Sequence, residues 1–220
     1  MKNFSDYREM AVRKNTMRAK CLWFTTWGNF INKNRVFISK KILDFGCDID
    51  SICYKQFVRQ NGGVNANYYG FDIADTTVGW LKDQNFYYDF WNDNSQKFDA
   101  INISEVYEHL DENLRENFIK RSRELLNEGG RLYMDIPYIA NLNIIEFFRR
   151  DRTHKSVACE DEAIYLERFG FKVRLFIGGY TIPYYNIFIN FYRIFTNILL
   201  GYKPFLVTFI IAEKMHENNN

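Results

Sequence analysis

The sequence predicts an α/β protein in which a mostly parallel sheet carries helices on both faces. From residue 41 onward, short apolar runs alternate with helical patterns, and such alternation is typical of parallel sheets. The chain has 220 residues, enough for one domain with a full core, and 47% of them are hydrophobic, which excludes global disorder. We expect an N-terminal helical cap over residues 1–40 and one α/β domain over residues 41–217.

The cap is predicted from apolar residues spaced three to four apart, on one face of a helix that ends near Asn32. These residues are Met17, Cys21, Phe24, Trp27 and Ile31. The helix either packs on the sheet or forms a lid over a ligand.

Seven apolar, β-rich runs follow, and we expect strands over residues 41–45, 68–73, 86–88, 98–103, 131–136, 171–177 and 205–212. The first five are predicted to be parallel because helical segments separate most of them. The last two are separated by an excursion over residues 178–203, and we expect them to form an antiparallel edge.

Helices are expected between these strands because stop and start signals flank them. Asn61-Gly62-Gly63 ends a helix over residues 51–60, and a short helix follows over 78–83. Asp111 caps a long helix that ends near Gly129-Gly130, with an apolar face of Leu114, Phe118, Leu125 and Leu126. Gly170 closes a helix over residues 160–169.

The overall charge and the cysteines exclude several classes of protein. The 29 basic and 27 acidic residues give a net charge of +2, too low to predict nucleic-acid binding. The four cysteines form no CxxC pair, and residues 1–20 are polar without a signal-peptide apolar region. We therefore expect reduced thiols and a cytoplasmic location.

The residues that follow the first three strands are the candidates for ligand binding, because open α/β sheets bind ligands beyond the carboxyl ends of their strands. Gly46 permits a tight turn after the first strand. Asp72, after the second strand, is placed to bind a ribose diol. Asp89 and Phe90, after the third, lie where an adenine would be bound and stacked.

At these residues the chain resembles the class I S-adenosylmethionine-dependent methyltransferases. Asp44-x-Gly46-Cys47 and Gly70-Phe71-Asp72-Ile73 look like the first two motifs of the family, and Ser104-Glu105-Val106-Tyr107-Glu108-His109-Leu110 looks like its fourth-strand motif in an "EHL" form. Gly129-Gly130-Arg131-Leu132-Tyr133 and Phe169-Gly170-Phe171-Lys172-Val173 resemble its fifth- and sixth-strand signatures. The ordered matches span residues 41–177.

The resemblance implies a Rossmann-like, seven-stranded sheet with an antiparallel last strand, and S-adenosylmethionine as cofactor. It implies that Asp44, Gly46 and Cys47 shape the loop at the methionine moiety, and that Asp72 and Ile73 hold the adenosine. It also implies that Asp89 and Phe90 meet the adenine, while Ser104 and Glu105 line the cofactor beyond the fourth strand.

The loop after the first strand departs from the family, because Asp48 and Asp50 stand where the family has its later glycines. Asp tolerates a positive φ better than most residues, so the turn can form. The two carboxylates would repel the cofactor's carboxylate unless they turn outward. A catalytically inactive subunit that binds a partner is therefore an alternative hypothesis.

Two of the three histidines are candidates for a catalytic base. His216 follows the last strand and is expected to be exposed. His109 follows the fourth strand, and His154 lies in Asp151-Arg152-Thr153-His154, which resembles a phrase of methyltransferases encoded with bacterial surface-glycan genes. Each also has a structural interpretation, His109 at a helix start and His154 as a helix cap. His154 is the preferred base.

The same region suggests the acceptor. Arg149, Arg150 and Arg152 cluster there, with Arg123 more distant, and they form either a solvated surface or a site for a phosphate or carboxylate. We therefore expect O-methylation of a sugar or another small metabolite, such as a phosphorylated or nucleotide-linked sugar in polysaccharide biosynthesis. N-methylation of a small amine is the alternative reaction.

Other chemistries are not predicted. The sequence lacks an HExxH motif and metal-spaced cysteines, so no metal site is expected. It also lacks the G-x-G-x-x-G loop of a nicotinamide dehydrogenase.

An aromatic segment over residues 184–202 carries one charge, Arg193, and a narrow polar stripe. We expect a helix that is buried, pairs two copies of the chain, or lies on a membrane surface at the inner face of the cell membrane.

Overall fold

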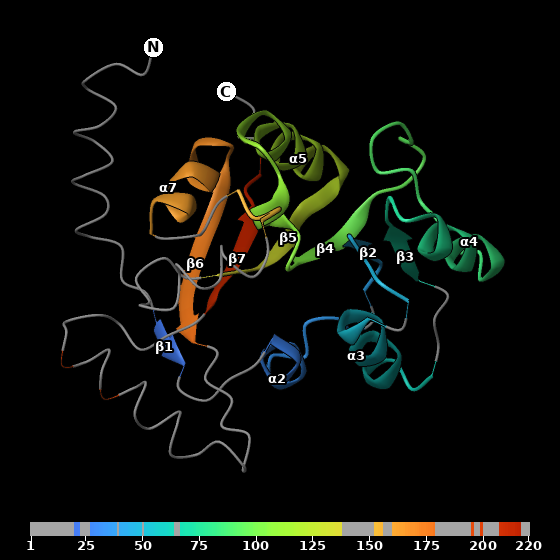
Figure 1. The fold of residues 1–220 in the computed structure, drawn as a ribbon, viewed down its shortest axis with the longest axis horizontal. Coiled ribbons are helices and arrows are strands. Elements are labelled where there is room, and N and C mark those ends of the chain that lie inside the picture. Colours follow the sequence, from blue (N-terminus) through green and yellow to red (C-terminus); the bar gives the residue numbers. More distant parts are fainter. Residues whose placement is uncertain are drawn as a thin grey trace.

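The computed structural model describes residues 20–22, 27–38, 40–49, 51–63, 67–137, 152–155, 160–178, 195, 199 and 207–216. These residues form one seven-stranded sheet with helices on both faces (Figure 1). The strand order is β1-β6-β7-β5-β4-β2-β3. The predicted fold class is therefore confirmed.

The strands are β1 (Lys20–Leu22), β2 (Ile42–Phe45), β3 (Tyr68–Phe71), β4 (Phe98–Ser104), β5 (Leu126–Pro137), β6 (Phe171–Gly178) and β7 (Val207–Lys214). All pairs are parallel except those of β7, which is antiparallel to both β5 and β6. The antiparallel last strand is confirmed, and the predicted antiparallel pair of β6 and β7 lies one strand in from the edge, because β1 pairs with β6. Phe209 and Ile211 are buried on one face and Ile210 and Ala212 on the other, as expected of an interior strand.

The helices are α2 (Trp27–Lys33), α3 (Ile52–Gln60), α4 (Asp75–Asp83), α5 (Glu112–Leu125) and α7 (Glu160–Arg168), with a 3₁₀ turn, η1 (Tyr107–His109). Figure 1 shows α5 and α7 on one side of the sheet and α2 and α3 on the other. Phe118 of α5 and Leu166 of α7 join one core, while Phe30 of α2 and Phe57 of α3 join a second. The sheet therefore separates two hydrophobic cores.

The predicted cap at Asp111 is confirmed, and Ser51 caps a second helix. The Ser51 hydroxyl accepts a hydrogen bond from the Tyr54 N–H at the start of α3, and the Asp111 carboxylate accepts one from the Leu114 N–H at the start of α5. These bonds satisfy backbone donors that the first turn of a helix leaves without partners. Both helices therefore begin where the sequence predicts.

Two predicted elements differ from those in the structure. Residues 86–88 form only an isolated bridge, because Gly70 is the one residue of β3 that bonds to the Phe86 carbonyl and the Tyr88 N–H before the chain turns at Asp89. Near the N-terminus, the predicted helix is wrong at Cys21, since Lys20–Leu22 pairs with β6, whereas Trp27–Lys33 is helical as predicted. Met17 and Phe24 lie outside the described residues. Phe30 stacks on Phe209 at 5.1 Å between ring centroids, so α2 packs on the sheet.

Most of the aromatic segment over residues 184–202 lies outside the described residues. Phe195 and Leu199 are described, and both are helical and exposed. Among the described residues, no helix combines the length and the apolar character needed to cross a bilayer.

The buried Asp44 carboxylate connects three elements at the carboxyl end of β2. It accepts hydrogen bonds from Tyr68 Oη on β3 at 2.8 Å, from Asn102 Nδ2 on β4 at 2.7 Å, and from Ser51 Oγ at 3.1 Å. Ser51 is the N-cap of α3, so one side chain ties both neighbouring strands to the helix that follows β2. Burial raises the pKa of Asp44, and the three hydrogen bonds oppose that rise.

We predict that Asp44→Asn flattens the pH dependence of stability. The folded chain keeps the Asp44 proton above the ordinary carboxyl pKa of 3.8, whereas the unfolded chain releases it. The free energy of unfolding should therefore fall as pH rises above about 4, by at most about 1.4 kcal/mol per pH unit. Asparagine removes the titration, while the Ser51 and Tyr68 hydroxyls can turn to accept from its amide.

Urea unfolding at several pH values between 4 and 8 measures this slope. Asp44→Ala is the control, and it should lose about 2–4 kcal/mol throughout, because it leaves buried polar partners unsatisfied. An unchanged slope in Asp44→Asn would show that Asp44 does not titrate in this way.

Candidate active site

The turn at Gly46 brings together the chain segments that leave β2, β3 and β4. Gly46 has a φ of +71°, and a Cβ placed there would lie 2.4 Å from Cγ2 of Val106, which follows β4. The Gly46 N–H donates to the carbonyl of Phe71, the last residue of β3, at 2.8 Å. Only glycine satisfies both the left-handed backbone and the close approach of Val106.

The side chain of Cys47 faces the core instead of the sheet edge. It is 1% exposed, and a Cβ on Gly70 would lie 2.6 Å from its sulfur. Burial, with the nearby charges of Asp44 and Asp72, raises the pKa of this thiol. The Cys47 side chain therefore belongs to the core, and its backbone is the part that can shape the loop at a cofactor.

Asp72 and Ile73 present a carboxylate and an aliphatic side chain beyond β3. The Asp72 carboxylate accepts a hydrogen bond from the Ala74 N–H at 2.8 Å, which turns the chain into α4. Ile73 is 89% exposed, and the β2–α3 segment adds two more exposed isoleucines, Ile49 and Ile52. An apolar surface beside a carboxylate suits a nucleoside, whose base is flat and whose ribose carries hydroxyl groups.

Asp48 of the acidic loop makes a local contact with the backbone. The Asp48 side chain is exposed and accepts a hydrogen bond from the N–H of Ile49 at 2.7 Å. The described non-glycine residues with positive φ are Arg35, Asn85 and Glu105, so Asp48 does not adopt the left-handed conformation of the glycine it replaces. Asp50 lies outside the described residues.

Asp89 and Phe90 occupy different environments. The Asp89 carboxylate is half-buried and accepts hydrogen bonds from the N–H groups of Trp91 and Asn92. Phe90 is fully buried, with Phe45, Trp91 and Phe118 around its ring. Its predicted stacking on an adenine is therefore not supported, because the ring belongs to the core.

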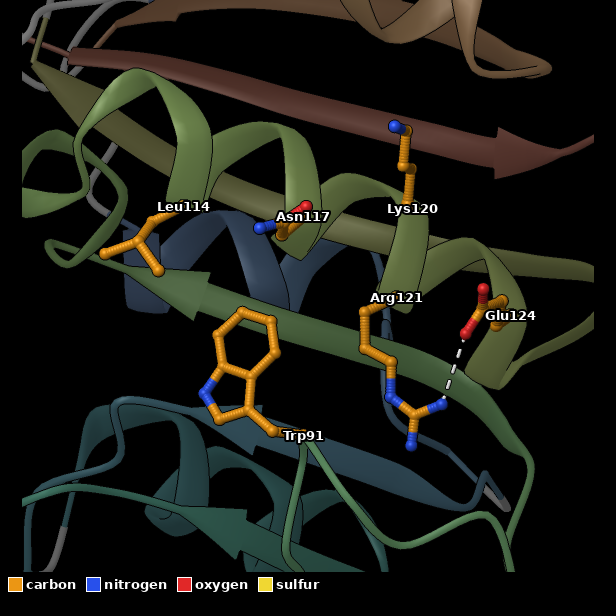
Figure 2. Close-up of a pocket in the computed structure, with 6 residues that line it drawn as sticks. All are labelled: Trp91, Leu114, Asn117, Lys120, Arg121 and Glu124. Carbon is orange, nitrogen blue, oxygen red and sulfur yellow. Dashed lines mark hydrogen bonds and ion pairs between the residues drawn. The ribbon is translucent and has the colours of Figure 1, made fainter.

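A groove beside Trp91 lies against α5 and contains none of the predicted site residues. It measures about 520 Å³ and is lined by Trp91, Leu114, Asn117, Lys120, Arg121 and Glu124 (Figure 2). Arg121 bonds the carbonyls of Phe90 and Asp93, each at 2.7 Å, and pairs with Glu124. These contacts hold the loop that carries Asp89 against α5, which is a structural role.

Three acidic residues, Glu105, Glu108 and Asp135, gather near the carboxyl ends of β4 and β5. Glu105 is exposed and has a φ of +55°, a strained conformation of the kind that often occurs at functional sites. Ser104 donates to Asp135 Oδ2 at 3.3 Å. Burial raises the pKa of Asp135 well above its ordinary value, and the charges of Glu105 and Glu108 raise it further.

The two histidines that the sequence selects lie in contact, although 45 positions separate them. The ring centroids of His109 and His154 are 4.6 Å apart. Nδ1 of His109 is 2.8 Å from Oγ1 of Thr153, and the Lys155 N–H donates to the Glu108 carbonyl at 2.7 Å. These bonds attach the 152–155 segment to η1.

The other predicted residues are placed as follows. His216 is 77% exposed beside Glu128, as predicted, and lies beyond the far end of β7. Arg152 is exposed next to Thr153, whereas Arg123 lies beside Gly170 at the end of α5. Arg149, Arg150 and Asp151 lie outside the described residues.

Sequence reasoning missed Glu108, Asp135 and Val106. Asp135 could have been found by the rule that selected Asp44 and Asp72, because it is an acid near the carboxyl end of an apolar strand. Glu108 could have been found because it directly precedes the candidate base His109 in the sequence. The contact of Val106 with Gly46 has no signal in the sequence.

The chain matches a known family over most of its length. A family model described as a methyltransferase domain matches residues 24–173. No curated protein matches the sequence significantly.

Solved structures share the fold at low sequence identity. A SAM-dependent methyltransferase from Archaeoglobus fulgidus is 15% identical, with a TM-score of 0.62 over 96% of this chain and 100% of that chain. Magnesium protoporphyrin IX methyltransferase from Synechocystis PCC 6803, solved with bound SAH, is 13% identical. Its TM-score is 0.54, over 97% of this chain and 89% of that chain. An O-methyltransferase family protein from Burkholderia thailandensis is 12% identical, with a TM-score of 0.52 over 97% of this chain and 61% of that chain. At these identities the likeness establishes the fold alone.

We predict that Gly46→Ala destabilises the chain by about 2–4 kcal/mol, because it combines a positive φ with a steric clash. Val106→Ala in the same chain should recover part of this loss, since it removes the clashing methyl groups and leaves the backbone strain. Urea unfolding of the single and double variants gives the coupling energy. Additive effects would contradict the close approach of these two residues.

Proposed function

The chain belongs to the methyltransferase domain family, whose cofactor is S-adenosylmethionine, and on that premise we propose that it methylates a hydroxyl group of a sugar or another small metabolite. The observation that carries the proposal is the arrangement at one edge of the sheet. The Gly46 turn and Asp72 lie at the ends of β2 and β3, and the His109–His154 pair lies beyond β4.

The residues at the ends of β2 and β3 fit the cofactor. Gly46 sets the turn that ends β2, Asp72 offers a carboxylate to the ribose hydroxyls, and Ile73 offers an exposed aliphatic surface to the adenine. The Asp89 carboxylate completes this set. Its oxygens keep lone pairs that the hydrogen bonds from the Trp91 and Asn92 N–H groups do not use. When bound, the cofactor supplies a methyl group already activated by a sulfonium.

The chain's own work is then to align the acceptor and to take its proton. Holding two reactants in line can contribute roughly 7–11 kcal/mol, and a positioned base typically adds about 10²–10⁴-fold. His154 is half-buried beside His109, whose ring Thr153 orients. This pair is the proposed place where an acceptor hydroxyl loses its proton.

A sugar that carries a phosphate or nucleotide is the proposed acceptor class. Arg152 is exposed next to Thr153, and its planar fork matches phosphate oxygens. The resemblance of Asp151–His154 to glycan-cluster methyltransferases supports the same class and a cytoplasmic location. N-methylation of a small amine, and an inactive subunit that binds a partner, are the alternatives, and Asp48 and Asp50 motivate the second.

We predict that the chain binds S-adenosylmethionine and that Asp72→Ala weakens this binding at least about tenfold, because the ribose loses a charged hydrogen-bond acceptor. Isothermal titration calorimetry measures the affinity. Asp83→Ala, at the opposite end of α4, is the matched control and should bind like the wild-type chain.

Release of the demethylated cofactor, measured over a panel of nucleotide sugars, sugar phosphates and small amines, identifies the acceptor. Turnover of hydroxyl acceptors is the expected result. Turnover of amines alone would replace the proposal with N-methylation, and the absence of cofactor binding would leave the inactive subunit.

A further inference from the structure

Three side chains beyond β4 gather in the pattern of a metal site. One ligand atom each from Glu108, His109 and His154 lies within 4.8 Å of the others. Ligand atoms about 2.0–2.3 Å from an ion in a tetrahedral site are about 3.3–3.8 Å apart, so the three side chains lie near enough to close on an ion by side-chain adjustment. We propose that Glu108, His109 and His154 bind a divalent first-row transition cation.

The ligand types define the class of cation. Two imidazoles and one carboxylate suit Mn²⁺, Fe²⁺, Co²⁺ or Zn²⁺ better than Mg²⁺ or Ca²⁺, which prefer oxygen ligands. Three protein ligands leave coordination positions open, as in catalytic metal sites. The site thus has room for an oxygen atom of a substrate.

Thr153 adds an orienting contact. A metal-bound histidine usually has its second ring nitrogen hydrogen-bonded, which fixes the ring. Nδ1 of His109 has such a contact with the Thr153 hydroxyl at 2.8 Å, so Nε2 is the nitrogen that would bind the cation. The bond from the Lys155 N–H to the Glu108 carbonyl holds the segment that carries His154 against η1.

The charge around the three ligands also favours a cation. Glu108 is 1% exposed, and the carboxyl of Asp135, 5% exposed, lies close enough to Glu105 and Glu108 for their charges to act on it. Oδ1 of Asp135 is buried and has no hydrogen-bond partner among the described residues. Buried carboxylates of like charge are costly unless a positive charge compensates them, and a divalent ion would supply it.

The cation would act on the acceptor, and this part of the inference rests on the proposed function. A cation held by these residues would lower the pKa of an acceptor hydroxyl bound at an open position, so that the proton of the hydroxyl could pass to solvent water. His109 and His154 then serve as ligands and do not remove the proton themselves. The chemistry of the acceptor deprotonation therefore differs from that of a histidine base, while its location stays the same.

Titration of chelator-treated protein with Mn²⁺ and Zn²⁺, without S-adenosylmethionine, tests the site. We expect one equivalent of either ion to bind by calorimetry, and Mn²⁺ to lose its free-ion paramagnetic resonance signal. Glu108→Gln and His154→Ala should weaken binding more than about 100-fold, and Thr153→Ala about 10–100-fold. His216→Ala, which removes the remote and exposed histidine, is the control and should bind normally.

Thermal unfolding without metal shows whether each variant folds, and only folded variants are compared. A wild-type chain that binds neither ion, or His154→Ala and Glu108→Gln variants that bind like it, would overturn the site. Cofactor binding measured in chelator separates the two proposals. If the chain binds the cofactor but no cation, only the cation-site proposal is refuted. If it binds a cation but no cofactor, only the methyl-transfer proposal is refuted.

Discussion

The carboxylate of Asp44 is the interaction on which the candidate site depends. It is buried, and it accepts hydrogen bonds from β3, from β4 and from the N-cap of α3. Each of those elements leads into a segment of the site: β3 into Asp72, β4 into Glu105, and α3 back into the Gly46 turn. Because all three bonds converge on one side chain, the ends of three elements are fixed relative to one another.

The Gly46 turn connects these fixed strand ends to the segments at the surface. Its N–H bonds to the end of β3 and its missing side chain admits Val106 from the β4 segment. The proposed cofactor site at the ends of β2 and β3 and the proposed cation site beyond β4 then lie along the same edge of the sheet. The first offers Asp72 and exposed Ile73 to a nucleoside, and the second joins Glu108, His109 and His154. That juxtaposition is what methyl transfer between two bound molecules requires.

Much of this could be predicted from the sequence, because its signals are local. Ser51 and Asp111 begin helices through contacts three residues away, and the apolar runs of β4, β5 and β6 are long enough to identify alone. Features set by distant pairing could not be predicted. Lys20–Leu22 has a helical spacing but pairs with β6, and residues 86–88 have a β-rich composition but meet β3 at one residue only. The side chains of Cys47 and Phe90 follow strand ends, yet packing turns both into the core. The candidate cation site was missed because His154 is 45 positions from His109.

A crystal structure of the chain grown with S-adenosylhomocysteine tests the central claim most directly. The account predicts electron density for the nucleoside at the ends of β2 and β3, with the ribose hydroxyls on the Asp72 carboxylate and the adenine against Ile73. The Gly46 turn should keep its left-handed backbone and its contact with Val106. Density elsewhere on the molecule, or a saturated crystal in which the carboxylates of Asp48 or Asp50 fill that edge, would contradict it.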